Sequence, residues 1–292
     1  MRNQSTGNSE PLGQKIADYS FEKRSILDCR TIERIVFFYE SFKRTISKNL
    51  TGIGIEKFCD GIAECDSEVV RAIFEHTEIV RSHMTPEIQL FLLTPNCNLY
   101  HTQYERISES KGIKRSVFLE PFWSIYWPGG QALTRFVLDE GRTLFESSKE
   151  ILDLGAGCGA TAIAAKLVGA DRVIANDIDR VACTAISMNA ILNRVNVKVS
   201  RQNLLYELPE KTIDVIFIGD MLYDAEIAAT LIPWLEKARD NGTRIYLGDP
   251  GRHGLTEDLK KRLKVLRHYR LPENVQKENY GYDSCNVWEF CG

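Results

Sequence analysis

The spacing of hydrophobic residues changes after residue 150. From there on, short apolar runs alternate with longer stretches in which apolar residues recur every three or four positions. The predicted strands cover residues 151–154, 172–175, 197–199, 214–218 and 243–247, and the predicted helices cover 161–168, 180–189, 225–239 and 256–263. Two last runs, 265–271 and 286–290, predict a closing antiparallel hairpin. This alternation predicts an α/β fold with a doubly wound, mostly parallel seven-strand sheet.

Helical spacing also predicts three elements before this region. Residues 67–77 have the apolar periodicity of a helix. A second helix is expected to begin at Thr85-Pro86-Glu87 and to end near Pro95, because a capping residue followed by proline is a typical helix start. An aromatic loop over 121–130 leads into the third predicted helix, over 131–138.

The first 66 residues are expected to form an N-terminal extension. Residues 1–20 are polar, whereas residues 31–50 carry apolar side chains at helical spacing beside basic ones. Residues 41–55 contain three basic residues and no acidic one, a composition typical of an organelle transit peptide. Residues 1–67 as a whole carry ten basic and ten acidic residues, so the alternative is an amphipathic helix packed on the core.

The composition of the chain narrows both the class of protein it belongs to and the kinds of partner it can bind. The chain has 292 residues, of which 43% are hydrophobic and 26% are charged, as in an ordinary globular protein. Its formal net charge of −3 provides no overall field to attract nucleic acid or an anionic membrane surface. No apolar run approaches the ~18 residues of a membrane span. We therefore expect neither a nucleic acid nor a membrane as partner.

Eight cysteines are spread along the chain without a Cys-x-x-Cys pair, which argues against a zinc ribbon or a thioredoxin-type site. We expect all eight to be reduced, in an intracellular compartment. We expect no metal site either, because His83, Glu87 and His101 lack the spacing of metal ligands.

A glycine-rich turn follows the first predicted strand of the sheet and contains Gly155, Gly157 and Gly159. Glycines at such a turn let the backbone approach a ligand, and the N–H groups of the following helix point at it. The segment Gly155-x-Gly157-x-x-Ala160 also fits the dinucleotide fingerprint G-x-G-x-x-G/A, which is a weak signal by itself. A cofactor site and a tight turn without a ligand both remain open on this evidence.

Carboxylates stand at the ends of three predicted strands. Asp153 lies near the end of an apolar strand, where a buried carboxylate needs a ligand ammonium or a backbone donor. Asp177 follows the second strand, where an acidic residue holds ribose hydroxyls, whereas Asp179 fits better as the N-cap of the next helix. Asp220 follows the fourth strand, in the crevice where open α/β sheets bind ligands. Asp224 fits as the N-cap of the helix after it.

The densest basic run lies at residues 260–270 and contains six Lys or Arg residues. Leu259, Leu263 and Leu266 would supply its buried side, so a solvated face is the main interpretation. Docking of an acidic protein partner is the alternative.

The motifs Asp153-x-Gly155-x-Gly157-x-Gly159, Asp177 and Asp220-x-x-Tyr223 together resemble those of the seven-strand S-adenosylmethionine-dependent methyltransferases. Within that superfamily, Asp-x-x-Tyr is typical of protein-lysine methyltransferases. The resemblance narrows to the electron transfer flavoprotein β-subunit lysine methyltransferases through the segments 85–90, 93–97, 123–133, 157–165, 175–179, 219–224 and 248–252. It covers about residues 67–292. Residues 67–112 are expected to form an N-terminal helical segment, and residues 113–292 the methyltransferase domain.

The resemblance implies S-adenosylmethionine as the cofactor, lying over the turn from Gly155 to Gly159. The methionine part is expected near Asp153, Trp127 and Gly129. Asp177 is expected to hold the ribose. The residues expected to border the adenine are Ile178, Asn203 and Leu204.

The resemblance further implies lysines of the electron transfer flavoprotein β-subunit as the substrate, in the mitochondrial matrix. Methyl transfer from a sulfonium to an amine needs no metal and depends chiefly on alignment. Asp220 is expected to orient the amine and help accept its proton, and Tyr223 to shape a pocket that excludes water. The alternatives are another protein substrate such as a ribosomal protein, a cytoplasmic location, and an NAD-dependent oxidoreductase. The last lacks a Tyr-x-x-x-Lys motif or a histidine placed for hydride transfer.

Overall fold

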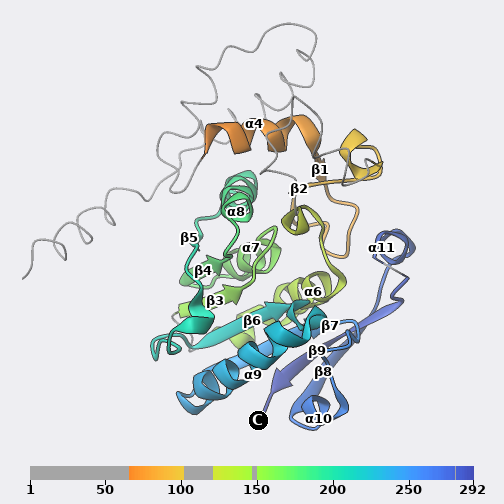
Figure 1. Cartoon of the computed structure of the whole chain (residues 1–292). Helices are drawn as coiled ribbons and strands as arrows, with labels where there is room; N and C mark the ends of the chain where they lie inside the picture. The colour runs from red at the N-terminus through yellow and green to blue at the C-terminus, as the bar shows by residue number, and fades with distance from the viewer. Residues whose placement is uncertain (1–65, 102–120, 147–149, 280) are drawn as a thin grey trace, which may run out of the picture.

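The computed structural model of the chain describes residues 66–101, 121–146, 150–279 and 281–292 (Figure 1). Its main feature is a seven-stranded sheet with the strand order β5-β4-β3-β6-β7-β9-β8. The parallel strands are β3 (Glu150–Leu154), β4 (Arg172–Asn176), β5 (Lys198–Ser200), β6 (Val215–Gly219) and β7 (Arg244–Asp249). Strand β9 (Ser284–Phe290) is antiparallel to β7 and to the edge strand β8 (Leu263–Arg270). The predicted doubly wound, mostly parallel sheet with a closing hairpin is confirmed.

Both faces of this sheet are covered by helices. The helices α6 (Pro128–Leu144), α7 (Ala160–Leu167) and α8 (Arg180–Leu192) contribute to one buried cluster, and α9 (Ala225–Asp240) and α10 (Glu257–Lys260) contribute to another. Alternate residues of one strand take part in different clusters: Val215 and Phe217 in the first, Ile216 and Ile218 in the second. A strand buried on both sides is apolar throughout, which is why this region of the sequence is so easily recognised.

Helix α4 (Ser67–His76) confirms the helix predicted over 67–77. The Asp66 carboxylate caps it by accepting the Glu68 and Val69 N–H groups. The apolar side of α4 packs on α8, which lies beneath it in Figure 1. The N-terminal extension, with its transit-peptide composition, precedes this helix and lies outside the described residues, as do Cys29, Cys59 and Cys65. The division of the chain at residues 66 and 112 stays a prediction.

The helix predicted from Thr85 to Pro95 is wrong. A turn leads instead into β2 (Leu90–Leu92), which pairs antiparallel with β1 (Glu78–Val80), a strand that the pattern did not predict. The Asn189 side chain of α8 accepts the Phe91 N–H at 2.8 Å, and Asn193 accepts the Gln89 N–H at 2.8 Å. These tertiary bonds satisfy the backbone in an extended form and override the local signal of a cap and a proline.

Two further elements depart from the predicted pattern. Helix α10 is shorter than the predicted helix over 256–263, because the Arg262 carbonyl already accepts the Cys291 N–H at the start of the β8–β9 pairing. Helix α11 (Glu273–Glu278) was not predicted. The other predicted helices and strands agree with the structure apart from a few residues at their ends, the largest difference being the length of α6.

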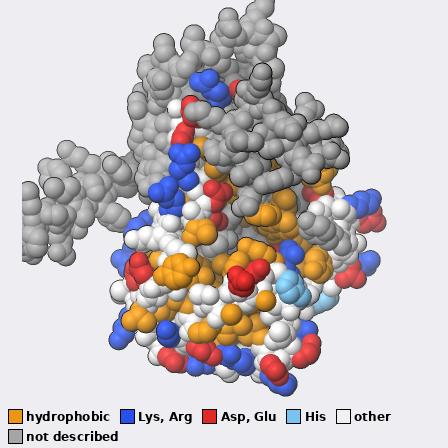
Figure 2. All heavy atoms as spheres, in the orientation of Figure 1, with side chains coloured by type: hydrophobic (Ala, Val, Ile, Leu, Met, Phe, Trp, Pro, Cys, Tyr) orange, Lys and Arg blue, Asp and Glu red, His pale blue; other side chains and the backbone are white. Residues whose placement is uncertain are grey.

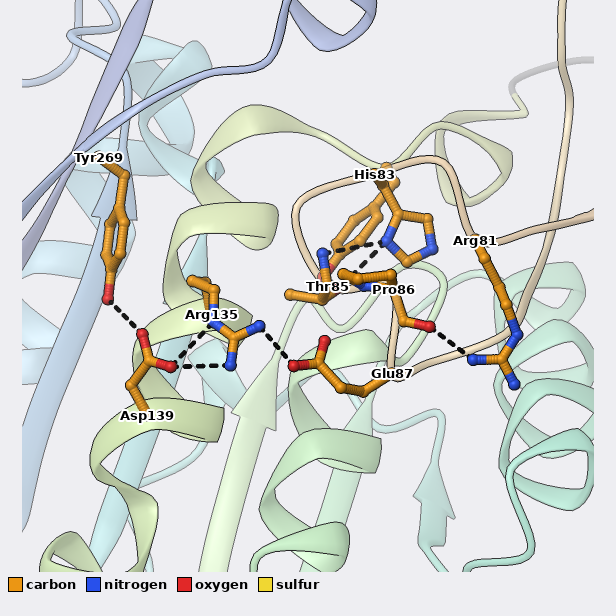
Figure 3. Close-up of polar contacts among 9 residues, drawn as sticks. Arg81, His83, Thr85, Pro86, Glu87, Arg135, Asp139 and Tyr269 are labelled. Atoms are coloured by element: carbon orange, nitrogen blue, oxygen red, sulfur yellow. Dashed lines mark hydrogen bonds and ion pairs between the residues drawn. The ribbon is translucent and has the colours of Figure 1, made fainter.

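The segment Thr85-Pro86-Glu87 is anchored to α6 rather than starting a helix (Figure 3). Arg135 of α6 lies between Glu87 and Asp139, with a nitrogen 2.7 Å from a carboxylate oxygen of each. On the other side of the segment, His83 Nδ1 accepts from the Thr85 backbone N–H at 3.3 Å. Burial lowers the pKa of His83 to about 4, so the ring is neutral near pH 7.

Within the described ranges, the five cysteines are free thiols, of which Cys97, Cys158, Cys183 and Cys285 are buried and Cys291 is exposed. Among these same residues, no three His, Cys, Asp or Glu side chains are placed to hold a metal ion. None of the helices in this part of the chain is both long enough and apolar enough to cross a membrane.

Candidate active site

The glycine-rich turn joins β3 to α7 along a left-handed backbone path. Gly155, Gly157 and Gly159 have φ values of +65°, +54° and +80°, which glycine adopts without steric cost. A Cβ at Gly159 would press on Ile186 of α8, so this glycine allows the two helices to pack closely. Among the described residues, a Cβ at Gly157 would meet only the Trp123 Cα, at 4.0 Å. The turn is therefore open at Gly157, where a ligand can lie against it.

Asp153 lies on β3 and is only 3% exposed. Its Oδ2 accepts the N–H of Ala162, in the first turn of α7, at 2.9 Å. Burial raises the pKa of Asp153 to about 7, and the nearby Asp177 carboxylate adds to this effect. A bound cation would offset the burial and the repulsion from Asp177, because it stabilises the ionised form of Asp153. A pyrophosphate would be repelled, because a carboxylate already takes an N–H at the helix end that phosphates bind.

Asp177 follows β4 and reaches back to the glycine-rich turn. Its Oδ2 accepts the Gly157 N–H at 2.9 Å, and its Oδ1 accepts the Asp179 N–H at 3.0 Å. Burial raises the pKa of Asp177 as well. Asp179 caps α8 by accepting the Val181 N–H at 2.9 Å, as predicted. The structure thus brings Asp153, Gly157 and Asp177 together, although they come from three separate segments.

The three residues expected to border an adenine lie at the carboxyl ends of β4 and β5. Ile178 is 64% exposed, Asn203 is exposed and Leu204 is half-buried. Asn176 holds these two strand ends together, because its Nδ2 donates to the carbonyl oxygens of Ser200 (3.1 Å) and Gln202 (2.9 Å). The structure brings the three residues to one edge of the site, and their contact with adenine stays a prediction.

The first turn of α6, which follows Trp127, lies directly against the ends of β6 and β7. A Cβ at Gly129 would overlap the Gly248 carbonyl oxygen, and a Cβ at Gly248 would overlap the Gly129 carbonyl oxygen. A Cβ at Gly219 would press on the backbone of Gly130. This close backbone contact places the positive end of the α6 dipole beside the residue that follows β6, which is Asp220.

Asp220 is 5% exposed and has a left-handed backbone, with φ of +55°. Its Oδ2 accepts the N–H groups of Gly129 and Gly130, and its Oδ1 accepts Nε of Arg252 at 2.7 Å. Burial raises the pKa of Asp220 to about 6, although Arg252 acts to lower it. A non-glycine residue in this conformation costs roughly 1–3 kcal/mol, and such residues cluster at functional sites.

Tyr223 lies one short helical turn after Asp220 and is 51% exposed. The next residue, Asp224, caps α9 as predicted, since its carboxylate accepts the N–H groups of Glu226 and Ile227. The motif Asp220-x-x-Tyr223 therefore places a buried carboxylate and a half-exposed aromatic ring at the same strand end.

The basic run at 260–270 is largely neutralised within the chain. Lys260 and Lys261 form ion pairs of 2.8 and 2.7 Å with Glu257 and Asp258, and Arg267 pairs with Glu140. Two more of its basic residues lie beside acidic ones, Arg262 beside Glu236 and Lys264 beside Glu289. These pairs favour the solvated-face interpretation over docking of an acidic partner.

Comparison with known proteins identifies the family. The model for the ribosomal protein L11 methyltransferase (PrmA) family matches residues 129–248. The chain is 42% identical over 229 residues to the electron transfer flavoprotein beta subunit lysine methyltransferase of Mus musculus, covering 77% of this chain and 85% of the relative. The protein of the same name from Homo sapiens is 42% identical over 77% of this chain and 83% of its own length, and that from Danio rerio 39% over 77% and 84%.

The chain belongs to the electron transfer flavoprotein β-subunit lysine methyltransferase family. It is therefore an enzyme, an S-adenosylmethionine-dependent methyltransferase. This overturns the oxidoreductase alternative.

The observed site fits S-adenosylmethionine. The cofactor carries a sulfonium and an ammonium group, and the site offers the carboxylates of Asp153 and Asp177. Burial raises the pKa of both, and a neighbouring cation would favour their ionised forms. The turn that they flank is open at Gly157. Asp153 and Asp177, with the open turn, would hold the cofactor.

Sequence reasoning missed two charged residues at this site, Arg252 and Asp249. Arg252 binds Asp220, and Asp249 is 2% exposed and shapes the loop that carries Arg252. Both belong to the segment 248–252, which the resemblance had singled out without a role. The segment was the signal in the sequence that could have pointed to these residues. It does not indicate that Arg252 pairs with Asp220, which lies 32 positions earlier in the sequence.

Proposed function

We propose that this chain transfers methyl groups from S-adenosylmethionine to lysines of the electron transfer flavoprotein β-subunit. The observation that carries the proposal is the hydrogen bonding of the Asp220 carboxylate. A carboxylate offers about four acceptor positions, and Gly129, Gly130 and Arg252 take three of them. Within the described part of the chain, one position is left for an N–H donor such as the amine of a lysine.

The burial of Asp220 limits what can reach that position. With 5% of the residue exposed, only a slender group can approach, and a lysine has a four-carbon unbranched stem that ends in its donors. Tyr223, which is half-exposed at the same strand end, would line the stem and keep water away from the amine.

The raised pKa of Asp220 also helps it to take part in proton transfer. A lysine ammonium has a reference pKa of ~10.4 and must lose its proton before it can attack. A carboxyl pKa of about 6 in place of 3.8 narrows the difference between the two groups from about 6.6 to about 4.4. Asp220 would orient the amine and share its proton on the way to solvent. When bound, the cofactor supplies a methyl group on a positively charged sulfur.

A protein substrate is supported by exposed apolar residues on the segments between the strands of the sheet. These are Ile178, Tyr206, Leu208 and Tyr223, with 64%, 83%, 76% and 51% of each residue exposed. Figure 2 shows hydrophobic side chains grouped over the described part of one face, with charged side chains around them. Exposed apolar groups of this kind, bordered by charges, are typical of protein-binding surfaces. The printed names of the relatives support the flavoprotein as the partner.

A ribosomal protein is the second candidate substrate, favoured by the match to the L11 methyltransferase family. That match spans residues 129–248, which run from the start of α6 to β7 and hold the residues expected to bind the cofactor. The match therefore supports S-adenosylmethionine as the methyl donor more than it supports a particular protein as the methyl acceptor. The flavoprotein is the preferred substrate.

We also propose that the enzyme acts in the mitochondrial matrix. The supporting observation is the composition of residues 41–55, with three basic residues and no acidic one. Imaging of the full chain with a C-terminal tag tests this proposal. Overlap with a matrix marker is expected, and a diffuse cytosolic signal would contradict it.

The substrate is tested by transfer of a labelled methyl group from S-adenosylmethionine. Purified electron transfer flavoprotein and purified ribosomal protein L11 are incubated separately with the enzyme, and the labelled bands are compared. Label in the flavoprotein β-subunit alone is expected. Label in L11 with none in the flavoprotein would reject the proposed substrate in favour of the second candidate.

A further inference from the structure

The segment from Gly248 to Arg252 folds into a compact arm at the end of β7. The Asp249 Oδ1 accepts the N–H groups of Gly251 (2.7 Å) and Arg252 (2.8 Å), which closes a turn over Pro250. Gly251 has φ of +102°, a conformation that favours glycine. Gly248 is required by the contact with Gly129. The turn therefore holds Arg252 in a defined position at the end of β7.

Arg252 is fixed on three sides in that position. Its Nε is 2.7 Å from Asp220 Oδ1. The centre of its guanidinium lies 5.3 Å from the centroid of the Trp127 ring and 5.6 Å from that of the Tyr282 ring, within the range of cation–π attraction. Its side chain is 12% exposed, so the ion pair is shielded from solvent and from salt.

We propose that Arg252 is a positioning residue for methyl transfer, which holds the Asp220 carboxylate ionised and turned toward the incoming lysine. This inference rests on the role of Asp220 in the proposed function. Arg252 acts through Asp220, and the two aromatic rings hold the guanidinium in a single orientation. One acceptor position of Asp220 then faces the same way in every molecule, as efficient transfer requires.

Of the residues that the structure describes, three with titratable or charged side chains face Asp220 from the elements packed against it. The Arg252 guanidinium lowers the pKa of Asp220, whereas the Asp249 carboxylate raises it. The Cys285 thiol of β9 has its own pKa raised well above the usual value by burial, so it stays neutral. The first turn of α6 contributes only backbone N–H groups. Asp220 therefore lies between a cation and an anion that act in opposite directions.

The proposal can be tested with two variants that are expected to change the pKa of Asp220 in opposite directions. Arg252→Gln removes the cation, and Asp249→Asn removes the anion while keeping the oxygen that closes the turn. Arg252→Lys keeps the charge but loses the planar group between the two rings. Arg267→Gln, which breaks an exposed ion pair with Glu140, is the matched control. Each variant is first checked for unaltered melting temperature and S-adenosylmethionine affinity.

The first measurement needs no substrate: the Asp220 carboxyl is titrated by carbon-13 NMR, and its signal is assigned by its absence in Asp220→Asn. Arg252→Gln is expected to raise the pKa of Asp220 by about 1–3, the usual effect of losing a close opposite charge. Asp249→Asn is expected to lower it, and Arg252→Lys and Arg267→Gln are expected to change it little.

The second measurement is the pH profile of kcat with the flavoprotein substrate. The acidic limb of this profile, where kcat falls as the pH decreases, should move to higher pH in Arg252→Gln and to lower pH in Asp249→Asn. The KM for S-adenosylmethionine should stay unchanged. Arg252→Lys should keep the wild-type position of the acidic limb but reach a lower maximal kcat, because it retains the charge without the planar group that the two rings hold in one orientation. An Arg252→Gln enzyme with the wild-type titration and the wild-type limb would overturn the inference. An active Asp220→Asn enzyme would instead overturn the proposed role of Asp220.

Discussion

The carboxylate of Asp153 on β3 accepts the backbone N–H of Ala162 at 2.9 Å, in the first turn of α7. A side chain from the preceding strand thus takes an N–H at the helix end that phosphate groups bind in other α/β proteins. The same carboxylate is almost fully buried, and burial raises its pKa to about 7. It is poised to gain a cationic partner.

Binding of S-adenosylmethionine should therefore depend on pH. In the free enzyme, Asp153 is mostly protonated below about pH 7, while the α-amino group of the cofactor keeps its charge there. Binding must then release a proton, so the Kd should rise about tenfold for each pH unit below 7 and level off above it. Calorimetry between about pH 5.5 and 7.5 measures this dependence. In Asp153→Asn the binding should be weak and independent of pH. A wild-type Kd that is constant over the range would contradict the assignment.

The contact between α6 and β7 predicts opposite effects for two adjacent glycines. Gly129→Ala should lower the free energy of unfolding by about 2 kcal/mol or more, because its Cβ would overlap the Gly248 carbonyl oxygen. Gly130→Ala is the matched control, since its Cβ would lie 3.7 Å from the Tyr126 ring in ordinary contact. As a glycine replaced inside a helix, it should raise stability by up to about 1 kcal/mol. Urea denaturation of the two variants decides, and equal stabilities would refute the contact.

Asn189 should be the main polar link between α8 and the N-terminal strands. It is fully buried, accepts the Phe91 N–H and donates to the Cys158 carbonyl oxygen, both at 2.8 Å. Asn189→Ala leaves both groups buried without partners, which should cost about 2–6 kcal/mol of unfolding free energy. Asn193→Ala should cost less, because that residue is half-buried and water can replace its bonds to Gln89. Comparable losses in the two variants would argue against this view.

Tyr223 should contribute through its ring rather than its hydroxyl group. Tyr223→Phe is expected to keep kcat/KM for the protein substrate near the wild-type value. Tyr223→Ala is expected to lower it about 10–100-fold, because water would enter beside the lysine and the amine would be less well aligned. Steady-state kinetics with S-adenosylmethionine at saturation gives both numbers. A phenylalanine variant as impaired as the alanine variant would assign the effect to the hydroxyl group instead.

The sheet, the glycine-rich turn and the helix caps could be predicted from the sequence because each depends on local patterns. Strands covered on both faces are continuous apolar runs, as in β6. Left-handed turns need glycine, as at Gly155 and Gly157. The N-caps Asp179 and Asp224 bond to residues two or three positions away.

The remaining features depend on contacts between distant segments, and no local pattern encodes them. Strand β2 forms against a local signal for a helix: Asn189 of α8 accepts the Phe91 N–H, and Asn193, just after α8, accepts the N–H of Gln89, just before β2. The position of Arg252 on Asp220 depends on where β6 and β7 end in space. For the same reason, the burial of Asp220, which sets its raised pKa, could not be judged before the fold was known.

The most direct measurement is tandem mass spectrometry of the electron transfer flavoprotein β-subunit after incubation with S-adenosylmethionine and either the wild-type enzyme or Asp220→Asn. Calorimetry alongside shows that the variant still binds the cofactor. The wild-type enzyme is predicted to add methyl groups to lysine side chains of the β-subunit, and Asp220→Asn to add none. Methylation of a different residue type, an unmodified β-subunit with the wild-type enzyme, or full methylation by Asp220→Asn would each contradict the account.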